Sequence, residues 1–316
     1  MGFLGSKAML IDFPNFALNN PWQVKTIQTS APMPVKIVRS LEECDCFALH
    51  ISWEHILLRS CSTAEEASQV ASAMDDFLRR QARKSIIIWT LHNETAHNVP
   101  FKESEAQLRD VIMEHAAIIF LMSEKHLFKI PEAHHHKVKF NPHYIESSPL
   151  DSVPRFSEPT FFRYGAARDE TNEGLYLDIL NRSNINKFVS DKRLNGELNE
   201  PCQVVTKRRF TLHEADLYAR FANFSTFYRK PKFNSGVLNF MIGNKLVVFH
   251  DADATKYMDL PACFEKFRIP MDSFDEDCLG DMVAHLNDNI EEIDEYIAAR
   301  HPAIVSDRFW EAVASL

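Results

Sequence analysis

The sequence predicts an α/β fold divided into two halves. Short apolar runs of strand length alternate with longer amphipathic segments of helix length, as in parallel sheets covered by helices. The chain has 316 residues, which is enough for two domains. Residues 147–159 contain three prolines and several serines, and they are the predicted linker between the halves.

Composition excludes several classes of function. Hydrophobic residues make up 45% and charged residues 25% of the chain, which is typical of a soluble globular protein. Only 8 glycines are present, and neither GxGxxG nor the Walker A pattern occurs, so a glycine-rich phosphate loop is excluded. The net charge of -9 argues against a broad nucleic-acid-binding surface.

The cysteines and the apolar runs indicate a cytoplasmic protein. Six cysteines lie scattered without CxxC spacing, which suits reduced thiols better than disulfides or a zinc site. We find no signal peptide and no apolar run long enough to cross a bilayer. The expected location is therefore the cytoplasm.

The first half, residues 1–146, is predicted to be a doubly wound α/β domain. Its helices are expected at residues 22–29, 63–83 and 104–116, and Thr63 with Glu66 forms a capping box for the second of them. The expected strands are residues 8–13, 35–38, 47–51, 86–90, 117–122 and 138–140.

Residues 85–98, SIIIWTLHNETAHN, are the stretch around which the first half is organised. The run of three isoleucines indicates a strand buried on both faces. His92 follows this strand at once and His97 lies close behind, at the edge where open α/β sheets bind ligands. The two histidines are candidates for chemistry, with simple hydrogen bonding of the loop as an equal alternative.

A second strand end offers similar chemistry. The predicted strand 47–51 contains His50 and is followed by Trp53 and Glu54. A histidine, an aromatic ring and a carboxylate are therefore expected at the end of this strand. The alternative is that Trp53 belongs to the core and Glu54 to a helix cap. By contrast, three consecutive histidines at residues 134–136 cannot all face one ion, and we interpret them as a solvated loop.

The second half begins after the linker and is expected to form a domain over residues 160–299, followed by a helical tail, 300–316. Thr211 with Glu214 forms a capping box for a helix over residues 211–221. Further helices are expected at 173–182, 291–299 and 307–316, the last two separated by Pro302, and strands at 160–164, 187–189, 202–205, 224–228 and 246–249.

Residues 229–251 contain a candidate anion site. Cations including Lys232 precede Asn234, Ser235 and Gly236, which can open a helix that runs through Met241. Free backbone N–H groups and the helix dipole favour an anion at such a terminus, and Gly236 lets a diphosphate approach the backbone. An ordinary capped helix beside a solvated basic loop is the alternative.

Five segments resemble, in order, motifs of the GT-B glycosyltransferases, above all those of bacterial exopolysaccharide and surface-polysaccharide synthesis. They are FPNFALNNPWQ, ALHISWEH, IIIWTLHNETAH, FFRYGAARDETNEG and FYRKPKFNSGVLNFMIGNKLVV. The resemblance implies two Rossmann-like domains that face each other across a cleft, with the tail 300–316 packing back across the domains. It also implies transfer of a hexosyl group from a UDP- or GDP-sugar to a saccharide or lipid-linked acceptor, without a metal or another cofactor.

The resemblance also implies roles for individual residues. His92 matches the histidine that faces the donor sugar and the reacting centre, and is the expected catalytic residue. Trp53, Glu54 and His97 would face the acceptor. The expected donor-binding residues are Arg168, Lys232, Asn234, Ser235, Gly236 and Asn239.

Departures from the motifs keep two alternatives open. Arg168 is offset, Thr171 or Asn172 stands where the family has Lys, and Asn239 stands where many relatives have Glu. These changes favour a catalytically inactive GT-B relative that serves as a binding or partner subunit. A third hypothesis is an unrelated two-domain α/β protein that binds small anions.

Membrane contact is a separate hypothesis. Residues 78–84 form a basic cluster beside apolar residues, and many enzymes of this kind touch the inner face of the membrane. Peripheral binding there is one interpretation, and a solvated helix end is the other.

Overall fold

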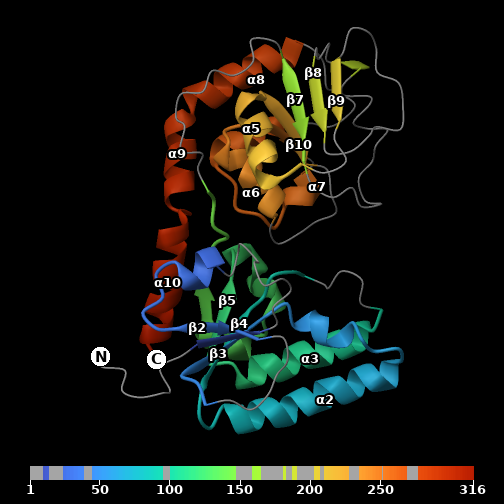
Figure 1. Cartoon of the computed structure of the whole chain (residues 1–316), viewed down its shortest axis with the longest axis vertical. Helices are drawn as coiled ribbons and strands as arrows, with labels where there is room; N and C mark the ends of the chain where they lie inside the picture. The colour runs from blue at the N-terminus through green and yellow to red at the C-terminus, as the bar shows by residue number, and fades with distance from the viewer. Residues whose placement is uncertain are drawn as a thin grey trace. The chain divides into compact units, whose positions relative to one another are not determined.

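The computed structural model divides into two compact units (Figure 1). The first unit comprises Met1–Tyr144 and Pro302–Leu316, and the second comprises Ile145–His301. The structure describes residues 10–13, 24–38, 45–94, 100–146, 159–164, 181–182, 187–190, 203–206, 210–227, 235–250, 252–268 and 277–316. Apart from Pro159, the predicted linker 147–159 lies outside these ranges.

A parallel six-stranded sheet forms the centre of the first unit, in the order β2-β1-β3-β4-β5-β6. Its strands are β1 (Leu10–Phe13), β2 (Val35–Ile37), β3 (Ala48–Ser52), β4 (Ile86–Thr90), β5 (Ile118–Leu121) and β6 (Val138–Phe140). The central strands β3 and β5 are buried at every residue because both faces of the sheet are covered.

Helices of the first unit connect and cover these strands. The two long ones, α2 (Ala64–Gln81) and α3 (Lys102–His115), run side by side (Figure 1). Thr63 caps α2 by accepting a hydrogen bond from the Glu66 backbone, while the Glu66 side chain accepts from Ser62 rather than from Thr63. Shorter turns are η1 (Val24–Gln28), η2 (Glu54–Leu58), η3 (Glu124–Lys129) and η4 (Glu132–Lys137).

The last helix, α10 (Pro302–Ala314), completes the core of the first unit. Phe309 stacks on Phe120 with ring centroids 4.9 Å apart, and the Trp310 indole donates a 2.8 Å hydrogen bond to the carbonyl of Ile27. Pro302 was predicted to separate two helices, but it is the first residue of α10. A helix tolerates proline there because that N–H needs no partner.

The second unit has a parallel five-stranded sheet in the order β11-β10-β7-β8-β9. Its strands are β7 (Thr160–Arg163), β8 (Lys187–Ser190), β9 (Gln203–Thr206), β10 (Phe224–Phe227) and β11 (Val247–His250). Its helices are α5 (Leu212–Phe221), α6 (Gly236–Gly243), α7 (Ala252–Thr255), η5 (Ala262–Phe267), α8 (Asp277–Asp288) and α9 (Ile290–Ala298). The predicted capping box of Thr211 and Glu214 is present at the start of α5.

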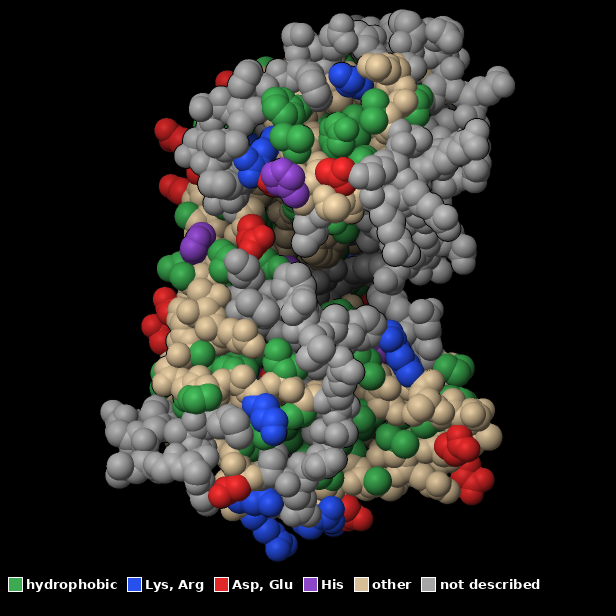
Figure 2. Space-filling model, in the orientation of Figure 1, with side chains coloured by type: hydrophobic (Ala, Val, Ile, Leu, Met, Phe, Trp, Pro, Cys, Tyr) green, Lys and Arg blue, Asp and Glu red, His purple; other side chains and the backbone are tan. Residues whose placement is uncertain are grey.

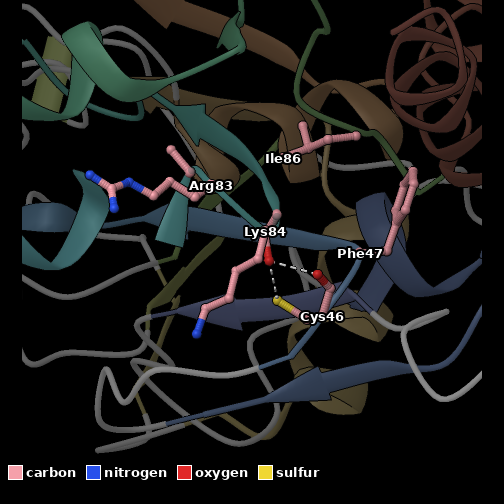
Figure 3. A pocket seen from close by; sticks show the side chains of 7 residues that line it. Cys46, Phe47, Arg83, Lys84 and Ile86 are labelled. Atoms are coloured by element: carbon pink, nitrogen blue, oxygen red, sulfur yellow. Dashed lines mark hydrogen bonds between the residues drawn. The ribbon is translucent and has the colours of Figure 1, made fainter. Parts of the chain in front are cut away.

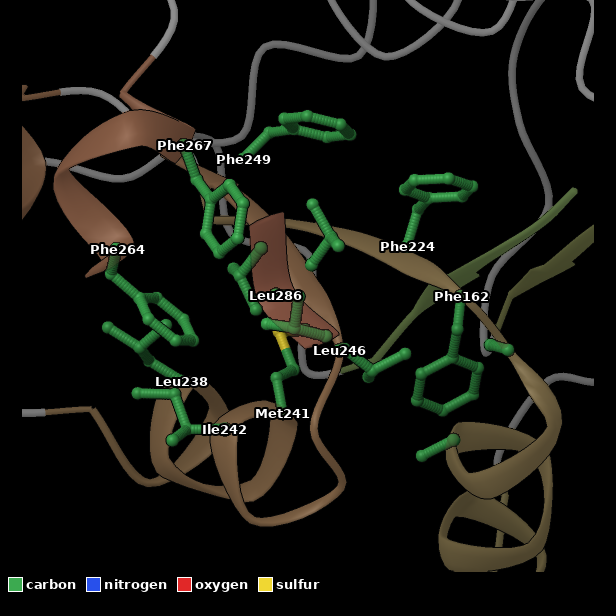
Figure 4. Close-up of a cluster of buried hydrophobic side chains, with 14 of the residues drawn as sticks. Phe162, Phe224, Leu238, Met241, Ile242, Leu246, Phe249, Phe264, Phe267 and Leu286 are labelled. Atoms are coloured by element: carbon green, nitrogen blue, oxygen red, sulfur yellow. The ribbon is translucent and has the colours of Figure 1, made fainter. Parts of the chain in front are cut away.

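Phenylalanine rings dominate the core of the second unit (Figure 4). Phe224 and Phe249 stack with centroids 5.9 Å apart, and Phe161 packs 6.2 Å from Phe249. Helix α6 adds Leu238, Met241 and Ile242 to this cluster, so burial of its apolar face anchors the helix to the sheet. Because α6 is packed against the core, the position of its first turn, at Ser235 and Gly236, is fixed relative to the sheet of the second unit.

Two parallel, helix-covered sheets confirm the predicted α/β fold class. On the face seen in Figure 2, hydrophobic and charged side chains are interspersed among the described residues. The exposed large hydrophobic side chains belong to different elements: Phe128, Phe140, Val204, Leu217, Ile304 and Leu316. In the described part of the chain, no helix is both long and apolar enough to cross a membrane.

Candidate active site

The carboxyl ends of β1, β3 and β4 meet at one edge of the first sheet. The chain order reverses between β1 and β3, which makes this edge the switch point where open α/β sheets bind ligands. Trp53 follows β3 and His92 follows β4, so the register brings the two predicted residues to the same edge.

The His92 and Trp53 rings are stacked. Their centroids are 4.6 Å apart and their planes differ by 7°. The Trp53 backbone has φ 55° and ψ 41°, the left-handed region that costs an L-residue roughly 1–2 kcal/mol. A bulky residue kept in this conformation indicates that the surrounding contacts hold the ring in place.

Burial favours the neutral form of the His92 imidazole. Its side chain is 3% exposed, and burial lowers its pKa well below 6.5, with the neighbouring His50, His143 and His55 lowering it further. A neutral ring has one donor and one acceptor nitrogen. It can therefore hydrogen-bond a sugar hydroxyl without carrying charge to the reacting centre.

A buried hydrogen-bonded chain crosses the three strands behind His92. His50 Nδ1 donates to Asp12 Oδ1 at 2.7 Å, and His50 Nε2 lies 2.8 Å from Thr90 Oγ1. All three side chains are buried, and Phe309 packs edge-on against the His50 ring at 5.6 Å. Asp12 was missed from the sequence, although a carboxylate inside an apolar strand was the available signal.

Glu54 is tied to the protein on both carboxylate oxygens. Arg109 Nε donates to Oε1 at 2.8 Å, and the Trp89 indole approaches Oε2 at 3.4 Å. The side chain is 2% exposed. Glu54 therefore lies beside Trp53 as the partner of Arg109, a residue that the sequence analysis did not single out.

The other predicted residues of the first unit have different outcomes. His97 lies outside the described residues, and so does the opening segment FPNFALNNPWQ apart from Phe13. His135 lies in the short helix η4 and donates to the Ile130 carbonyl at 2.8 Å. Within the described ranges, no group of three or more His, Cys, Asp or Glu side chains is arranged to hold a metal ion.

In the second unit, Ser235 caps α6 and is 7% exposed. Its Oγ accepts a 3.2 Å hydrogen bond from the Leu238 backbone. Gly236 is exposed, and Asn239 lies one turn into the helix with its N–H bonded to the Ser235 carbonyl. The predicted residues Arg168, Lys232 and Asn234 lie outside the described residues.

A cavity of about 520 Å³ lies at the opposite, amino-terminal edge of the first sheet (Figure 3). Cys46 and Phe47 precede β3, while Lys84 and Ile86 lie at the start of β4. The nearby Arg79 pairs with Asp75 and Asp76, so carboxylates neutralise part of the basic cluster 78–84. Sheets of this class bind ligands at the other edge, which is where His92 lies.

No known family profile and no characterised protein matches the sequence itself. The fold does match solved structures. HepE of Anabaena, solved in complex with UDP, superposes with a TM-score of 0.59 at 9% identity, covering 98% of this chain and 99% of that one. The chain has the GT-B fold of glycosyltransferases.

Trehalose-phosphate synthases share this GT-B fold. The UDP-forming enzyme from Burkholderia vietnamiensis matches with a TM-score of 0.57 at 11% identity, over 87% of this chain and 75% of that one. The enzyme from Burkholderia xenovorans, solved with glucose-6-phosphate, matches with a TM-score of 0.57 at 10% identity, over 86% and 73%. The resemblance inferred from the five motif segments is thus confirmed at the level of the fold.

Proposed function

We propose that this protein transfers a hexosyl group from a UDP- or GDP-sugar to a saccharide or lipid-linked saccharide in the synthesis of a bacterial polysaccharide. The observation that carries this proposal is the buried His92 ring stacked on Trp53 at the ligand-binding edge of the first sheet of a GT-B fold. His92 is the proposed catalytic residue, hydrogen-bonded to the donor sugar beside the bond that breaks.

Donor binding is assigned to the second unit. The start of α6 offers backbone N–H groups and a positive dipole end to the diphosphate, with Ser235 and Gly236 at the terminus. Lys232, Asn234 and Arg168 would add charge and hydrogen bonds, and Asn239 would lie near the ribose. These groups can stabilise the leaving diphosphate without a metal or another cofactor.

Acceptor binding is assigned to Trp53 and the neighbouring Glu54, and His97 would add a further contact. An aromatic face suits the apolar face of a sugar ring. A saccharide acceptor and a cytoplasmic location fit this proposal. The basic cluster 78–84 lies at the opposite edge of the first sheet, so contact with the inner face of the membrane through that cluster would not bring a lipid-linked acceptor directly to Trp53.

The alternative function is a catalytically inactive GT-B relative that acts as a binding or partner subunit. Asn239, where many relatives have Glu, is the observation that favours it. The two functions differ in one measurable respect, which is turnover of a nucleotide sugar.

Calorimetric titration with UDP, GDP and their sugar conjugates, without and then with Mg²⁺, tests the proposal. We expect one nucleotide to bind without metal. His92→Ala should lower kcat about 10²–10⁴-fold, because the mutation removes the hydrogen-bonding group at the reacting centre, while nucleotide affinity stays near that of the wild type. His135→Ala, in η4 of the same unit, is the matched control and should leave turnover unchanged.

Two results would contradict the assignment. Equal turnover of His92→Ala and the wild type would remove His92 from the chemistry. Absence of binding to every nucleotide and nucleotide sugar would overturn the transferase and favour the partner subunit.

A further inference from the structure

Arg109 in α3 joins two segments that are distant in sequence. Its guanidinium, 13% exposed, donates from Nε to Glu54 Oε1 at 2.8 Å. Nη1 donates to the Glu94 carbonyl at 2.6 Å, and Nη2 donates to the Asn93 carbonyl at 3.2 Å. One side chain thus contacts both the segment after β3 and the segment after β4.

The two segments carry the stacked rings. Glu54 directly follows Trp53, and Asn93 directly follows His92. Arg109 therefore hydrogen-bonds to the residue that follows each stacked ring, Glu54 after Trp53 and Asn93 after His92. Since Trp53 is in the left-handed region, its position depends on contacts of this kind.

A second carboxylate orients the guanidinium. Glu105, one turn earlier on α3, lies 3.0 Å from Arg109 Nη2, and Lys102 Nζ lies 3.2 Å from the same carboxylate group. Glu54 and Glu105 are both buried, so the charge on Arg109 is compensated where water is scarce. This arrangement uses three nitrogens of a planar fork, which a lysine ammonium cannot reproduce.

We propose that Arg109 is the positioning residue of this site, holding the Trp53–His92 stack in register for the transfer reaction. The inference rests on the proposed function for its effect on turnover, but the geometry of the stack can be measured independently. Arg109 acts through Glu54 and the two loop carbonyls, and it has no assigned contact with donor or acceptor.

The test compares Arg109→Lys and Arg109→Met with Arg79→Lys and Arg79→Met. Arg79 is the matched control because it also pairs with carboxylates from a helix, α2, but is exposed at the surface. Three quantities are measured: kcat and KM with the donor that binds, nucleotide affinity by calorimetry, and the His92 ring-proton chemical shifts by NMR.

We expect both Arg109 variants to lower kcat at least 10-fold, with nucleotide affinity and donor KM within about twofold of the wild type. The ring current of Trp53 should shift the His92 ring protons in the wild type, and this shift should shrink in both variants. Arg79 variants should match the wild type in all three quantities.

His92 ring signals at the wild-type position in both Arg109 variants would overturn the proposal, whatever the turnover. If Arg109→Met does not fold, the result for Arg109→Lys tests the proposal. Lysine keeps the buried positive charge and removes only the planar guanidinium with its several donors. A wild type without turnover on any nucleotide sugar would refute the proposed function, while the His92 signals would still test the role of Arg109.

Discussion

Several histidines cluster at the first unit's candidate site. His50, His55 and His143 each lie near enough to His92 to lower its pKa further. Burial also lowers the pKa of His55, and it lowers that of His143 to about 4 although the Tyr144 carbonyl accepts a 2.8 Å hydrogen bond from its Nδ1. At neutral pH, burial therefore favours the uncharged forms of His92, His55 and His143.

Stability is expected to fall in acid because of these histidines. The unfolded chain takes up the His143 proton near pH 6.5, whereas the folded chain does so only near pH 4. The stabilisation is thus complete above about pH 7 and is lost as the pH falls from about 6.5 to 4. For His143 alone the loss is on the order of 3 kcal/mol.

Urea unfolding at several pH values between 4 and 8 measures this effect. His143→Gln should flatten the dependence of the unfolding free energy on pH, because a glutamine side chain does not titrate. If the unfolding free energies of the wild type and of His143→Gln change equally with pH, His143 is not the source of the loss of stability in acid.

At the scale of elements, Gly243 and Gly280, which both lie in helices of the second unit, differ in their surroundings. A Cβ on Gly243, at the end of α6, would lie 2.4 Å from the Glu146 carbonyl oxygen and 3.0 Å from Ile145 Cγ2. A Cβ on Gly280, inside α8, would meet no atom within 4 Å. The backbone contact at Gly243 is what allows α6 to pack closely against the segment after Tyr144.

Alanine at these positions should have opposite effects. Gly243→Ala should lower the free energy of unfolding by about 1–3 kcal/mol, because backbone atoms must move to admit the methyl group. Gly280→Ala should raise it by about 0.5–1 kcal/mol, because alanine loses less entropy in a helix. Urea unfolding measures both, and stabilisation by Gly243→Ala would contradict the close packing.

Each unit of the whole molecule has its own hydrophobic core. The cluster of the first unit includes Leu10, Ile88, Phe120 and, from the end of the chain, Phe309. The cluster of the second unit contains Phe161, Phe249 and Phe264. Residues near the end of the chain therefore stabilise the sheet formed by its beginning.

Truncating one phenylalanine in each core should separate the stabilities of the two units. Phe309→Ala leaves a cavity beside Phe120 and His50 and should destabilise the first unit by about 3–5 kcal/mol. Phe264→Ala is the counterpart in the second unit. Hydrogen exchange read by mass spectrometry should show lost protection within residues 10–144 for the first variant and within 145–301 for the second.

Protection lost equally in both units for Phe309→Ala would show that the cores are not independent. Retained protection in residues 10–144 would show that α10 contributes little to the first core.

The sequence by itself determined the local elements and the class of fold. The β-branched run at residues 86–90 is a strand with those bounds, Thr211 and Glu214 form the expected cap, and the ordered motif segments led to the GT-B fold. These features depend on side-chain spacing within a few residues, and such spacing can be read directly. Helix α8 was missed, and α10 was expected to start later than it does.

Only the tertiary structure decided how the site is assembled. Asp12 meets His50 across 38 positions, Arg109 meets Glu54 across 55, and Trp310 meets Ile27 across 283. Strand register brings the first pair together, the packing of α3 against η2 the second, and the contact of α10 with η1 the third. Local periodicity carries no record of such partners, because they follow from which strands pair and which helices cover them.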